Sequence, residues 1–215
     1  GGMLNLYAQP DQTVDVLAVG TSMTYAGVNT NVLWANWGMT AYDLASAEQQ
    51  YWNTYYYLEE ALKTQQPQVI LLDAKPATYP DDETKRGRTI MSTYGILSPD
   101  TRLAAIRVTA GEAWLDYALA FPQIHEFWKQ FSWSNVLPSG RTGGRSKSWK
   151  GFIEKDDLER HDKPSLVWTD IKRSINEREA EYFGKICDLA EEKGVELLLI
   201  AYPNPDYAND HMYYN

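Results

Sequence analysis

The sequence has few of the residues on which several common kinds of site depend. Its 215 residues include one cysteine, Cys187, which excludes an internal disulfide or a cysteine-rich zinc site. It has three histidines, and none stands with acidic residues at a spacing typical of metal ligands, so we expect no metal and no other cofactor. No run of about 18 apolar residues occurs, so no segment of this sequence is expected to cross a membrane.

Basic residues are also scarce relative to acidic ones, 20 against 29, which gives a net charge of −9. Binding to nucleic acid through phosphates needs a basic surface, so we expect no nucleic-acid partner. The same charge disfavours an anionic membrane, and we expect membrane contact only through a segment absent from this chain. Hydrophobic residues at 44% and charged residues at 23% are typical of a folded protein, and the length predicts a single domain over residues 1–215.

Short apolar runs at both ends of the sequence are typical of buried strands in a parallel sheet. They cover residues 14–20, 69–73 and 195–201, and a weaker strand is predicted over 40–44. Helical periodicity separates them. Ser46 and Gln49 predict a capping box before a helical face, and the members of that face are Tyr51, Tyr55, Leu58 and Leu62. The alternation predicts an α/β fold with a parallel sheet and helices on both faces.

Residues from about 76 to 172 interrupt this alternation, and we interpret them as a mostly helical insertion over one end of the sheet. Ser98-Pro99 predicts a helix start, because proline suits the first helical position, and a second helix is predicted over 125–131. The segment 141–150 carries four basic residues and no acidic one. It is either a solvated loop or a surface that attracts an anionic polymer, and its role stays open.

The pattern of strand and helix returns after the insertion. Ser174 with Glu177 predicts a capping box, and Gly194 a C-terminal cap. The expected buried face of this helix consists of Ala180, Phe183, Cys187 and Ala190. An open parallel sheet normally continues beyond a strand such as 195–201, so we expect this chain to lack the last strand and helix of its fold.

The first predicted strand ends in Gly20-Thr21-Ser22. In open α/β sheets the carboxyl edge of the strands is where ligands bind. A serine there presents its hydroxyl at the edge, and the amides of a following helix can stabilise a negatively charged oxygen. The pattern G-x-S also fits a helix N-cap or a turn, and the spacing alone leaves both interpretations open.

With its neighbours, this segment resembles the SGNH (GDSL-like) hydrolase superfamily, and most closely its bacterial surface branch of DltD-type and alginate O-acetyltransferase-like proteins. The resemblance rests on the order and spacing of 14–22, 38–46 with Gln49, 67–73 and 194–205, and it covers little of 76–172. It implies a three-layer sheet of SGNH type and a serine esterase or O-acyltransferase. The implied substrate is an acylated carbohydrate of the cell surface or a small ester, and the implied location is extracytoplasmic or on the cell surface.

The resemblance also implies roles for individual residues. Ser22 would be the catalytic nucleophile, and the oxyanion hole and pocket would be formed by Gly20, Thr21, Ala45, Ser46 and Asp73. A serine nucleophile needs a general base. Close relatives often carry histidine directly after the serine, where this sequence has Met23, and the family's Asp-x-x-His pair is absent.

Two alternatives remain beside the enzyme. His125, His161 and His211 are interpreted as packed or exposed side chains rather than as the base. Without a base, the protein would be a catalytically inactive SGNH-like module that binds glycan or a partner. Its aromatic platform would come from Trp114, Trp128, Trp133, Trp149 and Trp168. Nucleotide binding is disfavoured because no G-x-G-x-x-G follows a predicted strand.

Overall fold

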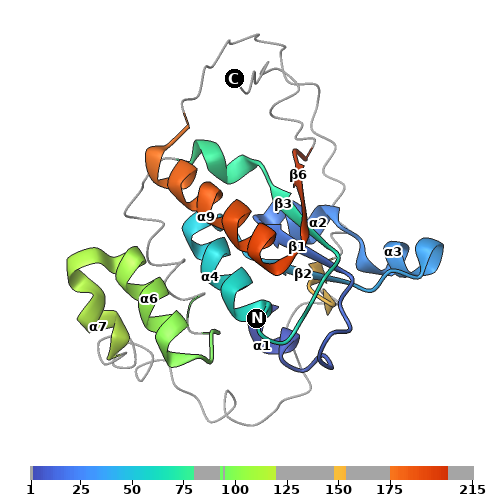
Figure 1. The fold of residues 1–215 in the computed structure, drawn as a ribbon, viewed down its shortest axis with the longest axis horizontal. Helices are drawn as coiled ribbons and strands as arrows, with labels where there is room; N and C mark the ends of the chain where they lie inside the picture. Colours follow the sequence, from blue (N-terminus) through green and yellow to red (C-terminus); the bar gives the residue numbers. More distant parts are fainter. Residues whose placement is uncertain (1, 80–92, 94, 120–147, 154–174, 203–215) are drawn as a thin grey trace, which may run out of the picture.

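The computed structural model describes residues 2–79, 93, 95–119, 148–153 and 175–202 (Figure 1). Within these residues four strands form a parallel sheet in the order β2-β1-β3-β6. The strands are β1 (Val16–Gly20), β2 (Ala41–Ala45), β3 (Val69–Asp73) and β6 (Glu196–Ile200). The predicted α/β class with a parallel sheet is therefore confirmed, whereas its SGNH type stays a prediction.

The central strand β1 is buried along its whole length, as its apolar, β-branched sequence predicts. Its register with both neighbours is fixed: Gly20 is paired with Ala45 of β2, and Val19 with Leu72 of β3. The carboxyl ends of these three strands therefore lie at one edge of the sheet.

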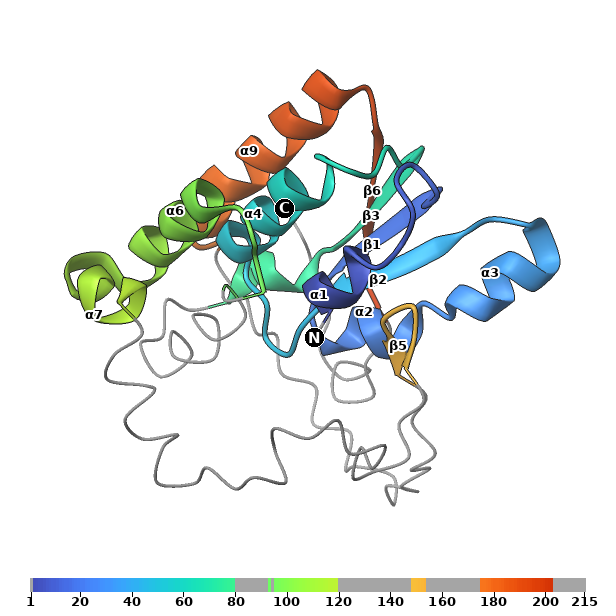
Figure 2. The same ribbon diagram turned by 90° about the horizontal axis from the view of Figure 1, so that it is seen from below.

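One face of the sheet carries the main hydrophobic core. Figure 2 shows α4 (Tyr51–Ala61), α6 (Pro99–Ala110) and α9 (Glu177–Lys193) on this side. Alternate strand residues such as Leu17, Val19 and Leu72 pack there against Trp52 and Ile186. The short helix α1 (Gly2–Leu6) adds Met3 and Leu6 to the same core.

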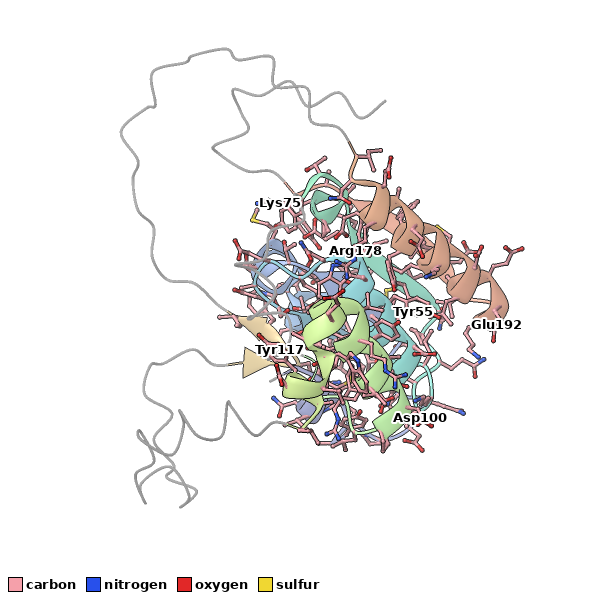
Figure 3. The ribbon with its side chains drawn as sticks, turned by 90° about the vertical axis from the view of Figure 1, so that its left-hand side faces the viewer. Tyr55, Lys75, Asp100, Tyr117, Arg178 and Glu192 are labelled. Atoms are coloured by element: carbon pink, nitrogen blue, oxygen red, sulfur yellow. The ribbon has the colours of Figure 1, made fainter. Side chains whose placement is uncertain are left out.

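Arg178 joins the helices of this face. Its guanidinium donates a hydrogen bond to the carbonyl of Val108 in α6 and lies 4.9 Å from the ring centre of Trp52 in α4. Figure 3 labels Arg178 close to α6. Beyond α6 the chain continues through η2 (Gly111–Ala113) and α7 (Trp114–Ala118). The helix predicted from Ser98-Pro99 is confirmed, with Ser98 as N-cap and Pro99 as the first helical residue.

The opposite face carries smaller elements. They are α2 (Ser22–Gly27), α3 (Thr30–Trp37) and the antiparallel pair β4 (Ser148–Trp149) and β5 (Phe152–Ile153). The carbonyl of Lys150, between β4 and β5, accepts a hydrogen bond from the amide of Asp43 at 2.8 Å. This bond holds the turn between β4 and β5 against β2.

Both predicted capping boxes are wrong, because the helices begin later. The Ser46 hydroxyl does donate to Gln49 Oε1 at 3.0 Å, but α4 has Gln50 as its N-cap residue. The first amide of α4, that of Tyr51, donates instead to Glu179 of α9 at 2.7 Å. The cap comes from a residue far along the chain, which local spacing cannot show. In α9 the capping residue is Asn176, whose side chain accepts from the amide of Arg178.

The buried face of α9 agrees with the prediction in part. Ala190 is buried and Phe183 packs against the core, as predicted, whereas Ala180 is exposed and Cys187 is half-buried. The other buried residues of the helix are Glu179, Tyr182, Ile186 and Leu189. The predicted C-terminal cap at Gly194 is confirmed, with φ of 64°.

The strand β6 forms where predicted but is not buried. Leu198 is 54% exposed and Leu199 is 50% exposed. Among the described strands β6 pairs with β3 alone, so it is an edge strand there.

Several predictions fall outside the described residues. They concern the helix over 125–131, most of the basic segment 141–150, His125, His161 and His211, and the side chains of Trp128, Trp133, Trp149 and Trp168. The structure neither confirms nor contradicts them.

Candidate functional site

The candidate site lies where the direction of strand order reverses. From β1 the chain adds β2 on one side and then β3 on the other, so the segments after β1 and β3 diverge at the carboxyl edge. Such a switch point is where open parallel sheets bind ligands. Gly20, Thr21 and Ser22 follow β1 there, and Asp73 ends β3.

Asp73 and Thr21 connect these two strand ends. The carboxylate of Asp73 is fully buried, and its Oδ2 accepts from the Thr21 amide at 3.1 Å and from the Thr21 hydroxyl at 2.5 Å. Its Oδ1 accepts from the amide of Lys75 at 2.9 Å. The Thr21 hydroxyl in turn accepts from the Met23 amide at 3.2 Å and so caps α2. Both carboxylate oxygens of Asp73 thus hold the backbone at the ends of β1 and β3, and its place in the oxyanion hole or pocket stays a prediction.

Gly20 is the residue that lets the two strand ends approach. Its φ is 150°, and a Cβ at this position would lie 2.3 Å from Cβ of Asp73 and 2.6 Å from the hydroxyl of Thr24. Any other residue would therefore separate β1 from β3 or displace α2.

Ser22 is the first residue of α2 and is half-buried. Its hydroxyl makes no hydrogen bond to any described residue. The amide of Ser46, expected as an oxyanion donor, instead donates to the carbonyl of Gly20 at 3.2 Å. Ala45 and Ser46 thus form the wall of the site beside Ser22, while their role in an oxyanion hole stays a prediction.

The strand that ends at Ala45 also carries a buried carboxyl group, which the sequence analysis missed. Asp43, in the middle of β2, is 1% exposed, and neither of its oxygens has a hydrogen-bond partner among the described residues. Burial raises the pKa of its carboxyl to about 8. An acidic residue inside an otherwise apolar predicted strand was the signal that could have identified it.

Tyr202 adds a second buried polar group on this face. Its ring lies on Gly27 of α2, where an added Cβ would be 2.9 Å from the ring. Burial raises the pKa of its phenol to about 12, and the neighbouring Thr24 hydroxyl acts in the opposite sense. Asp43 and Asp73 raise it further. The environment beneath α2 therefore favours the protonated, uncharged forms of Asp43 and Tyr202.

An apolar pocket of about 350 Å³ opens on the other face of the sheet, between η1 (Lys75–Thr78), α9 and β6. Its lining consists of Tyr51, Ala74, Ala77, Ile175, Glu179, Ala180, Phe183, Leu199 and Ala201. The hydroxyl of Tyr51 donates to the backbone carbonyl of Asp73 at 2.9 Å, which ties this pocket to the carboxyl edge.

The described residues offer no group of three or more histidine, cysteine or acidic side chains that could hold a metal ion. No helix in the described ranges is long and apolar enough to span a bilayer. Comparisons of the chain with protein-family models, with curated proteins and with solved structures find no match.

Proposed function

We propose that the protein is a serine-dependent esterase or O-acyltransferase that acts on acyl esters of cell-surface carbohydrate, with Ser22 as its nucleophile. The observation that carries the proposal is the position of Ser22 at the carboxyl edge, beside a Thr21–Asp73 connection that fixes the backbone on both sides of the switch point. The resemblance of the sequence to SGNH hydrolases supplies the reaction class and the extracytoplasmic location.

In this proposal the Ser22 oxygen attacks the ester carbonyl and forms a tetrahedral intermediate. The Ser22 amide, one of the first amides of α2 that have no partner within the helix, stabilises the oxygen that becomes negatively charged. The serine proton passes to a general base and then to the leaving alcohol. A second attack, by water or by a sugar hydroxyl, releases the acyl group from Ser22. The base comes from outside the described residues, which contain no histidine.

Covalent labelling tests the nucleophile. The full-length protein is treated with a fluorophosphonate, and the modified peptide is identified by mass spectrometry. We expect one adduct on Ser22, its loss in Ser22→Ala, and its retention in Ser46→Ala, which removes a second serine at the same edge. A folded full-length sample that is not labelled would contradict the proposal.

The sequence has no Asp-x-x-His pair, which the SGNH resemblance would lead one to expect as the base, and this favours one second candidate. A catalytically inactive module would keep the fold and hold glycan or a partner without cleaving esters. It is distinguished by the same experiment, because it predicts no labelling of Ser22 and no ester turnover.

A further inference from the structure

The helix α3 (Thr30–Trp37) presents two tryptophans to solvent. It projects from the body of the molecule beside β2 (Figures 1 and 2). Trp34 is 61% exposed and Trp37 is 65% exposed. Residues three apart in a helix are neighbours on its surface, so the two indoles belong to one side of α3. Large apolar side chains gathered in this way on a surface mark a binding site.

The stretch of sequence that carries the two indoles has no charged residue. No acidic or basic residue occurs from Val16 to Tyr42, although charged residues make up 23% of the chain. The exposed polar side chains of α3 are the amides of Asn31 and Asn36. Amides donate and accept hydrogen bonds without charge, so this surface complements a ligand that is neutral, rich in hydroxyl groups and apolar on one side.

We propose that α3 is a binding surface for a neutral carbohydrate chain, with the apolar ring faces of the sugars stacked on Trp34 and Trp37. Indole suits this contact because it offers a large, rigid apolar face together with a polar N–H group. The amide of Asn31, three residues before Trp34 and so a neighbour of it on the helix surface, supplies hydrogen bonds to sugar hydroxyls. The choice of a carbohydrate deepens the proposed function and rests on it, since α3 would hold the polymer whose ester groups Ser22 attacks.

The position of α3 separates this surface from the Ser22 site. The helix leads from α2, which begins at the carboxyl edge, to β2, which begins at the opposite edge, where Thr40 contacts Asp15. Binding at α3 and acyl chemistry at Ser22 are therefore separable by mutation.

Two other ligands fit the observations less well. An anionic polymer or an anionic bilayer would require basic side chains, which α3 lacks. A neutral bilayer favours an amphipathic helix with a continuous apolar face. The eight residues of α3 extend only about 12 Å and include exposed amides.

The test is titration of the full-length protein with hexasaccharides of β-1,4-linked glucose and of β-1,4-linked N-acetylglucosamine, followed by tryptophan fluorescence and calorimetry. We expect binding to at least one of them, weakened at least tenfold in the double variant Trp34→Ala/Trp37→Ala. Trp34→Phe should retain most of the affinity, because phenylalanine keeps an aromatic face. Leu119→Ala is the matched control, since it removes an exposed apolar side chain from α7's C-cap, away from α3.

Each other outcome overturns the inference. Lack of binding to both hexasaccharides does so, as does binding that the double variant leaves unchanged. Sedimentation with phosphatidylcholine vesicles, lost in the double variant, would assign α3 to a membrane. Self-association lost in the same variant would assign it to a second copy of the chain. Ser22→Ala should leave sugar binding intact and the double variant should still be labelled at Ser22, so failure at one site is distinguishable from failure at the other.

Discussion

Replacing Asp43 with asparagine should change how the stability of the protein depends on pH. The carboxyl of Asp43 is buried without a hydrogen-bond partner among the described residues, and the folded state therefore holds it uncharged. Its pKa is about 8 in the folded protein against an ordinary value of 3.8. The unfolded chain releases this proton as the pH rises above about 4, whereas the folded chain retains it up to about 8.

The sign and size of the effect follow from this difference. Between these two pH values the folded state binds more protons than the unfolded state, so the free energy of unfolding falls as the pH rises. Each pH unit corresponds to about 1.4 kcal/mol, so on the order of 4 kcal/mol is lost between pH 4 and pH 7. This is a large share of the 5–15 kcal/mol typical of a folded domain. Asparagine has the same shape and does not ionise, so Asp43→Asn should lack this slope.

Urea unfolding at pH 5, 7 and 8.5 measures the difference. We expect the free energy of unfolding of the wild type to fall by several kcal/mol over this range, and that of Asp43→Asn to vary much less. Above pH 7 the variant should be the more stable protein, although its second amide donor offsets part of the gain. Asp188→Asn, at an exposed position of α9, is the control and should follow the wild type. Parallel profiles for the wild type and Asp43→Asn would refute the reasoning.

Three further predictions concern stability and are measured by urea or thermal unfolding. Gly20→Ala should lower the free energy of unfolding by about 3 kcal/mol or more, because the added Cβ would lie 2.3 Å from Cβ of Asp73. The control Gly184→Ala lies at an open helical position and should be neutral or stabilising. Equal effects of the two substitutions would contradict this prediction. Asp73→Asn should lower the free energy of unfolding by about 2–4 kcal/mol, because one acceptor oxygen is lost while the Thr21 amide, the Thr21 hydroxyl and the Lys75 amide still need acceptors. An unchanged unfolding midpoint would be inconsistent with the hydrogen bonds between Thr21 and Asp73. Burial acts to raise the pKa of Glu60, but hydrogen bonds from Lys63 and other side chains outweigh it and lower the pKa. Glu60→Gln should therefore be about 1–3 kcal/mol less stable near pH 7, and the difference should shrink as the pH falls through the folded pKa; a difference that grows in acid would reject this account.

The strands of the sheet were predictable because burial on both faces produces continuous apolar sequence. The runs that became β1 and β3 were recognisable for this reason, and the order of strands and helices predicted the parallel sheet. The exposure of Leu198 and Leu199 was not predictable, since the same apolar run is compatible with a central strand or an edge strand. The composition of a segment can therefore identify it as a strand, but it does not show whether other strands pair with it on one side or on both.

The site was predictable in location but not in its contacts. Gly20-Thr21-Ser22 lies at the carboxyl edge, as the strand-end argument indicates. The bond between Thr21 and Asp73 joins residues 52 positions apart, and the cap of α4 by Glu179 joins residues 128 positions apart. Spacing rules describe only neighbours within a turn or two, so contacts of this kind follow from the fold alone.

The outer side of β6 has a consequence for handling the protein. Its backbone amides and carbonyls on that side have no strand beside them among the described residues, and two half-exposed leucines lie next to them. In natural sheets such edge strands often carry lysine or proline or are covered by a helix, because an unpaired edge strand can pair with an extended segment of another molecule. Leu198→Lys should therefore lower the tendency of β6 to pair with an extended segment of another molecule.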